Sequence, residues 1–239
     1  MWPFSSKRSI VDACLFDGFT DWHCHLLPGV DDGVKTLEET LELLDLYGQL
    51  GVRQVWLTPH TMEEMPNTPD TLRERFDTLR QAYAGAVKLH LASEHMLDNL
   101  FDDRLAAKCI MPVGDNGNHL LVETSYFTPP YDFDEKLDAI RSAGLFPVLA
   151  HPERYVYMED KDYNRLVSQG VILQLNIFSL IGMYGEDAAH KARRLLKKGM
   201  YTLVGTDTHS MRQFDHAIHA ACLKSSDIAL LRPLLSASL

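Results

Sequence analysis

Residues 21–33 read DWHCHLLPGVDDG, and this stretch holds the first two of a series of metal-ligand-type side chains. Its first residues belong to an expected strand over 19–22. In an extended segment His23 and His25 point the same way, so both imidazoles can reach one ion. Two such histidines taken alone are more often exposed or hydrogen-bonded than metal-bound. The interpretation therefore depends on the rest of the chain.

Further side chains of this type recur after apolar runs along most of the sequence. Runs of this kind precede His60, Glu123, His151 and Asp207. Residues just past the strand ends of a β/α barrel point into its active-site mouth. One zinc ion usually takes three or four protein ligands, so the set predicts a multinuclear metal site. Its nine members are His23, His25, Asp32, His60, Glu94, Glu123, His151, Asp207 and His209.

Short apolar runs alternate with amphipathic stretches, which indicates repeated βαβ units in an α/β fold. We expect one barrel domain over 19–239, preceded by an N-terminal arm over 1–18. Thr36 and Thr71 each begin a capping-box pattern that predicts a helix start. Seven strands are expected, at 19–22, 54–58, 88–92, 119–123, 146–150, 172–175 and 201–204. Helices are expected at about 37–50, 71–84, 133–143, 161–168 and 186–198, and after Met211.

Composition narrows the classes of function. The 239 residues are 46% hydrophobic, and the net charge of −10 argues against a nucleic-acid binder with a basic face. The four cysteines lack CxxC spacing, which favours free thiols, with Cys24 packed in the core. No stretch predicts a secretory signal or a membrane span, which favours a cytoplasmic protein. Trp2 and Phe4 would give at most a peripheral membrane contact, and packing on the domain is the preferred interpretation.

The opening motif resembles that of the PHP (polymerase and histidinol phosphatase) superfamily. Within it, the match is to bacterial manganese-dependent protein-tyrosine phosphatases of capsule and exopolysaccharide operons. The motifs LTPH (57–60), ASE (92–94), HPER (151–154) and GTDTH (205–209) continue the resemblance in chain order over about 19–215. The resemblance implies a distorted (β/α)7 TIM-like barrel with three divalent ions, expected to be Mn, with Fe, Zn or Co as alternatives.

The resemblance also implies how the ligands are divided. His23, His25, Glu94 and Asp207 would hold the first ion; Glu94, Glu123 and His151 the second; Asp32, His60 and His209 the third. Asp31 stays open as an alternative to Asp32. The expected partner is a tyrosine-phosphorylated protein, in particular the tail of a bacterial tyrosine kinase that controls polysaccharide export.

The reaction that the resemblance implies is hydrolysis of phosphotyrosine by a metal-bridging hydroxide. Arg154 is a candidate to bind a phosphoryl oxygen, with a salt bridge as the alternative, and Arg212 is a second candidate. No Cys-x5-Arg phosphatase loop is present in the sequence. The cysteinyl-phosphate route is therefore not expected.

Four alternatives stay open from the sequence. A phosphatase of the same superfamily could act on histidinol phosphate or a sugar phosphate. An amidohydrolase or deaminase also opens with HxH, but the carboxylates Glu94 and Glu123 and the late Asp-x-His pattern count against it. The net charge disfavours a nuclease. A non-catalytic, metal-bound regulatory module is the remaining class.

Overall fold

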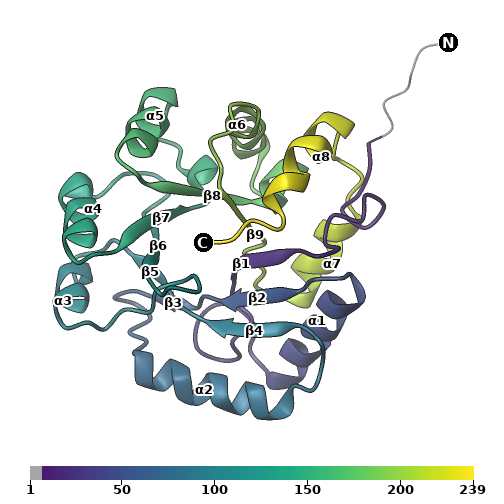
Figure 1. The fold of residues 1–239 in the computed structure, drawn as a ribbon, viewed down its shortest axis with the longest axis horizontal. Coiled ribbons are helices and arrows are strands. Elements are labelled where there is room, and N and C mark those ends of the chain that lie inside the picture. The colour runs from purple at the N-terminus through teal and green to yellow at the C-terminus, as the bar shows by residue number, and fades with distance from the viewer. Residues whose placement is uncertain (1–6) are drawn as a thin grey trace.

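The computed structural model describes residues 7–239, so the positions of Trp2 and Phe4 lie outside the described residues. In this part of the chain, the strands surround a common axis and the helices lie outside them, as Figure 1 shows along that axis. The strands are β1 (Thr20–Cys24), β2 (Gln54–Leu57), β3 (His60–Thr61), β4 (Lys88–Leu91), β5 (Glu94–Met96), β6 (His119–Glu123), β7 (Phe146–Ala150), β8 (Ile172–Asn176) and β9 (Leu203–Gly205).

The α-helices are α1 (Leu37–Gln49), α2 (Pro69–Ala82), α3 (Phe101–Ala106), α4 (Phe133–Ser142), α5 (Asp160–Ser168), α6 (Glu186–Lys197), α7 (Met211–His219) and α8 (Ser225–Leu231). The 3-10 helices are η1 (Pro152–Arg154), η2 (Ile177–Ile181) and η3 (Arg232–Leu234). The six helices expected from the sequence are present. The short helices α3 and α8 were not predicted.

All strand pairs are parallel, in the orders β1-β2-β4 and β3-β5-β6-β7-β8-β9. β3 continues β2 after two residues, and β5 continues β4 in the same way. If each continuation is counted together with the strand before it, the nine described strands make the seven that were expected. The single-domain TIM-like α/β fold is therefore confirmed, with its sheet interrupted at two strands.

β9 and β1 meet at a seam that closes the ring. The amide of Asp207 donates to the carbonyl of His23 (2.7 Å), and the amide of His25 donates to the carbonyl of Thr208 (2.9 Å). Gly205 permits this approach, because a Cβ there would lie 2.5 Å from the Cβ of His23. The seam joins the two motifs that contain His23, His25, Asp207 and His209.

The helix starts differ from the predicted capping boxes. The Thr36 hydroxyl accepts from the amide of Glu39 as expected, but the Glu39 carboxylate accepts from the amide of Met211 at the start of α7. The box predicted at Thr71 is wrong, since Thr68 caps α2 and Thr71 is the third residue of the helix. Pro69 explains the earlier start, because proline suits the first helical position.

The two ends of the described chain pack against the barrel. In the expected N-terminal arm, Ile10, Leu15 and Phe16 are buried in the main hydrophobic cluster. The last residues cross the end of the barrel where the strands begin: the Trp22 indole N–H donates to the carbonyl of Ala237 (3.2 Å). In Figure 1 this yellow segment lies within the ring of strands. The opposite end, where the strands finish, holds the candidate site.

No helix among the described residues is long and apolar enough to cross a membrane.

Candidate metal centre

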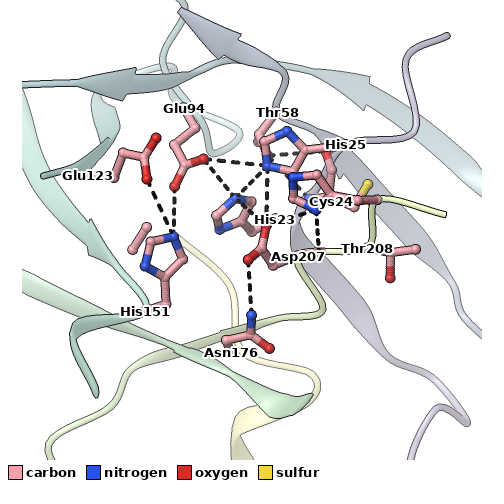
Figure 2. Close-up of polar contacts among 12 residues, drawn as sticks. His23, Cys24, His25, Thr58, Glu94, Glu123, His151, Asn176, Asp207 and Thr208 are labelled. Carbon is pink, nitrogen blue, oxygen red and sulfur yellow. Dashed lines mark hydrogen bonds and ion pairs between the residues drawn. The ribbon is translucent and has the colours of Figure 1, made fainter. Parts of the chain in front are cut away.

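The structure brings all nine ligand-type side chains together at the carboxyl ends of the strands. Figure 2 shows Glu94, Glu123 and His151 pointing toward one another on one side of His23 and Asp207. The ligand-type atoms form four overlapping groups whose members all lie within 4.8 Å of one another. These groups are His25, Asp32, His60 and His209; His23, His25 and Asp207; His23, Glu94 and His151; and His60, Glu94 and Glu123.

The distances between ligand-type atoms can be compared with the expected assignment of these residues to three ions. Glu94 Oε2 lies 3.2 Å from His23 Nε2, and Glu94 Oε1 lies 3.1 Å from His151 Nε2. The two oxygens of Glu94 therefore face one residue from each of the first two expected ligand sets, as those of a bridging ligand would. His60 also faces two groups: its Nε2 is 3.5 Å from Asp32, and its Nδ1 is 3.0 Å from Glu123. Which ion His60 would bind stays a prediction.

The neighbouring carboxylates of Asp31 and Asp32 face different groups. Asp31 Oδ2 is 2.8 Å from His25 Nδ1 and accepts from the amide of His60 (3.0 Å). Asp32 Oδ1 lies 3.5 Å from the Nε2 atoms of both His60 and His209. Asp31 thus lies behind His25, and Asp32 lies among the ligand-type atoms.

Two amide side chains that were not predicted support the ligands, and both come from β8. Gln174 Oε1 is 3.0 Å from His23 Nδ1, which leaves His23 Nε2 for the cluster. The Asn176 amide donates to Asp207 Oδ2 (3.1 Å), a contact drawn in Figure 2. Such outer partners fix the orientation of a ligand and tune its basicity. The signal in the sequence was two polar amides within a buried apolar strand.

Two ligand-type residues have a left-handed backbone. His151 has φ 34° and Asp207 has φ 53°. This conformation costs a non-glycine residue about 1–3 kcal/mol and concentrates at functional sites. Both residues directly or closely follow a strand, so the turn directs each side chain into the cluster rather than along the sheet.

The charges of the cluster suit cations. Burial alone would raise the pKa of Glu94, but His23 and His60 outweigh it and hold that pKa well below its usual range. Burial and His25 act to lower the pKa of His60, yet Glu94 and Glu123 raise it to about 10. Buried Glu94 Oε2, Glu123 Oε1 and His60 Nδ1 make no hydrogen bond with the described residues. Unsatisfied buried ligand atoms of this kind fit divalent metal ions.

The two candidate arginines differ in their surroundings. Arg154 Nη1 donates to Asp207 Oδ2 (2.6 Å), and its guanidinium lies between the rings of Tyr126 (4.4 Å) and Tyr184 (4.1 Å). The salt bridge considered for Arg154 is present, and the phosphate contact stays a prediction. Arg212 is exposed in the first turn of α7 and makes no hydrogen bond or salt bridge with the described residues.

The six remaining histidines lie outside the cluster. None of His90, His95, His119, His190, His216 and His219 belongs to a potential ligand group in the described chain. All four cysteines are free. Cys24 is buried in the core and its thiol donates to the carbonyl of Trp56 (3.4 Å), so its packing role is confirmed.

A family model described as "Capsular polysaccharide synthesis, CpsB/CapC" matches residues 19–225. The chain belongs to the CpsB/CapC family. Its relatives include the tyrosine-protein phosphatase CpsB of Streptococcus pneumoniae, 30% identical over 204 residues, which cover 80% of this chain and 83% of that one. The tyrosine-protein phosphatase YwqE of Bacillus subtilis is 26% identical over 198 residues, which cover 80% of this chain and 78% of its own.

Solved structures agree with the family in fold. A chain from the crystal structures of YwqE from Bacillus subtilis and CpsB from Streptococcus pneumoniae, described as unique metal-dependent tyrosine phosphatases, superposes with a TM-score of 0.75 at 22% identity. That match covers 91% of this CpsB/CapC chain and 88% of the other. An N6-methyl-AMP deaminase from Arabidopsis thaliana gives a TM-score of 0.51 at 12% identity, covering 93% and 92%, which is a likeness of the barrel alone.

Proposed function

We propose that this chain is a metal-dependent protein-tyrosine phosphatase. The observation that carries the proposal is the set of four overlapping ligand groups at the carboxyl ends of the strands. Membership of the CpsB/CapC family supports it, because the relatives named above are tyrosine-protein phosphatases. The nine ligand-type residues would hold three divalent ions, with Mn as the expected metal and Fe, Zn or Co as alternatives.

Bound divalent ions would lower the pKa of a water for attack on phosphorus and offset charge on the phosphoryl oxygens. The protein's own part is to hold the ligands ionised and oriented. One guanidinium N–H of Arg154 donates to Asp207, and the other guanidinium N–H groups make no hydrogen bond with the described residues. We propose that these groups donate to a phosphoryl oxygen, with Arg212 as a second, outer candidate.

The substrate proposed is phosphotyrosine on a protein. A phenolate leaving group has a pKa near 10, so its departure needs less help from a general acid than that of an alkoxide. By the resemblance stated above, the phosphoprotein would be a bacterial tyrosine kinase that controls polysaccharide export. Such a partner would place this protein in the cytoplasm.

Hydrolysis of a phosphotyrosine peptide tests the proposal. We expect activity to disappear on chelation, to return with Mn²⁺ and to be absent from His151→Ala. His190→Ala, an exposed histidine on α6 outside the cluster, is the matched control and should keep full activity. If metal-loaded wild type leaves the peptide intact but cleaves histidinol phosphate or a sugar phosphate, the protein-phosphatase proposal is wrong. Turnover of none of these esters would favour the non-catalytic alternative.

A further inference from the structure

The ligand cluster is reached from one side. The Asp32 side chain is 56% exposed and that of His209 is 25% exposed, whereas His23, His25 and Glu94 are fully buried. Asp32 and His209 therefore mark the exposed edge of the cluster, and a substrate can approach past Asp32. A groove of about 620 Å³ begins at this residue. Its volume falls within the range of about 300–1,000 Å³ found for ligand sites.

The groove lies between the loop that follows β1 and the segment that leads into α2. Gly29 and Val30 line it from the first, Met65 and Pro66 line it from the second, and Arg75 lines it from α2 itself. This groove, called the Lys35–Arg75 groove below, is continuous with the proposed active site through Asp32. Its volume has room for peptide residues next to a phosphotyrosine whose phosphate reaches the cluster.

The two cations of the groove are not neutralised by ion pairs. Helix α2 carries three arginines: Arg73 pairs with Asp70 (3.3 Å) and Arg80 pairs with Asp77 (3.7 Å). Arg75, the one that lines the groove, makes no salt bridge with a described residue. Lys35 donates only to the backbone carbonyl of Asp31. Both cations thus remain available for an acidic ligand.

Acidic side chains around the groove do not cancel these cations. The Asp31 carboxylate is buried against His25, and Asp32 faces the ligand histidines. Glu64 is then the single acidic lining residue that is not engaged with the cluster, against the cations of Lys35 and Arg75. The chain as a whole carries a net charge of −10, so it repels acidic peptides except where the surface is locally basic.

We propose that the Lys35–Arg75 groove binds the residues next to the phosphotyrosine and selects substrates with an acidic side chain there. This inference rests on the proposed phosphatase function and adds a substrate class to it. The occupant is a phosphotyrosine polypeptide with Asp or Glu beside the modified residue. Arg75 is the specificity-determining residue, since Lys35 also ties its own loop to Asp31.

Three phosphotyrosine peptides that differ only in the flanking residue, Glu, Gln or Lys, test the inference in metal-loaded protein. Wild type should prefer the Glu peptide over the Gln peptide in kcat/KM by about fivefold, the upper range for a solvent-exposed charge pair. Arg75→Gln should remove the preference, and Arg75→Glu should reverse it toward the Lys peptide. The wild-type preference should shrink as salt is added.

Arg73→Glu is the matched control, because it makes the same charge change on the same helix. Arg73 lines a different pocket, on the side of Phe76 and His90. It should keep the preference for the Glu peptide. Equal turnover of the three peptides by wild type, or equal effects of the changes at Arg73 and Arg75, would overturn the groove assignment.

A further substrate distinguishes failure of the groove inference from failure of the proposed function. Wild type is also assayed with p-nitrophenyl phosphate, which has no flanking residue. Cleavage of this ester and of all three peptides at similar rates leaves the phosphatase proposal standing and rejects the groove. No cleavage of any of the four rejects both.

Discussion

Asp31 and Asp32 are neighbours in sequence, but only Asp32 lies among the ligand atoms. We expect Asp32→Ala to lower the number of ions bound, because it removes a carboxylate from the group with His60 and His209. Asp31→Asn should keep that number and weaken affinity by about 10–100-fold, the usual cost of losing an outer partner of a histidine ligand. Metal analysis after equilibrium dialysis and calorimetric titration measure the two effects.

Asp45→Asn, an exposed acid on α1, is the control for the charge change and should alter neither quantity. The assignment fails if Asp31→Asn loses an ion while Asp32→Ala retains the full number. In that case Asp31 would be the ligand and Asp32 the outer residue.

The buried side chain of His95 should make the free energy of unfolding depend on pH. Burial, with a contribution from Arg104, lowers the pKa of His95 from 6.5 to about 3, and its Nε2 accepts from the amide of Met111 (3.2 Å). Below pH 6.5, His95 takes up a proton in the unfolded chain more readily than in the folded chain. The contribution of His95 is therefore complete above pH 6.5 and is lost as pH falls toward 3, at up to about 1.4 kcal/mol per pH unit.

His95→Gln should flatten this slope, because glutamine can accept from the same amide but does not titrate. Urea unfolding of metal-free protein from about pH 7 down to about pH 4 gives the free energy of unfolding of wild type and variant. Their difference should shrink steadily as pH falls. A constant difference would contradict the prediction, and exposed His190→Gln serves as the control.

Helix α1 stabilises the seam between β1 and β9 through the side chain of Tyr47. The Tyr47 hydroxyl lies 3.0 Å from Asp21, 2.9 Å from Thr206 and 3.1 Å from Thr208. Tyr47→Phe should lower the free energy of unfolding by about 1–3 kcal/mol, because buried polar groups lose their partner. Metal affinity should fall as well, since the seam positions four ligand-type residues. Urea unfolding of the metal-free protein and metal titration measure these changes.

Tyr83→Phe is the comparison for this change. Tyr83 directly follows the last residue of α2, and its ring is only partly buried. The Tyr83 hydroxyl accepts from the amide of Val87. The loss there should be smaller than at Tyr47. Equal losses of stability and unchanged metal affinity in both variants would mean that the seam does not depend on the Tyr47 hydroxyl.

The strands could be predicted more fully than the contacts between them. Apolar runs located β6 and β7 to the residue, because a strand buried on both faces has little polar sequence. The role of β8 was missed, although Gln174 and Asn176 hold His23 and Asp207. Such pairs are difficult to predict because their members are far apart in the sequence: Gln174 and His23 are 151 positions apart. They become neighbours only when β8 and β1 both take their places next to β9.

Closure of the barrel was predictable from the sequence, but the path of the last residues was not. Seven strands with ligand-type residues at their ends indicated the barrel mouth. Nothing in the local sequence indicated that Leu235 accepts from the amide of Thr20, or that Ala237 accepts from Trp22. Such contacts arise from the space left open at the end where the strands begin, so they depend on the assembled barrel.

Metal binding should stabilise the whole barrel, because the cluster joins residues from all but one of the seven strand positions. Ions that bind only the folded chain, at about 100 times their dissociation constant, stabilise it by about 2.7 kcal/mol. For a chain of this length that corresponds to a rise in Tm of about 5–10 °C. Calorimetry with chelator and with added Mn²⁺ measures the rise. His151→Ala should show a smaller rise and exposed His190→Ala the full one; equal rises in both variants would mean that Mn²⁺ stabilises the protein from outside the cluster.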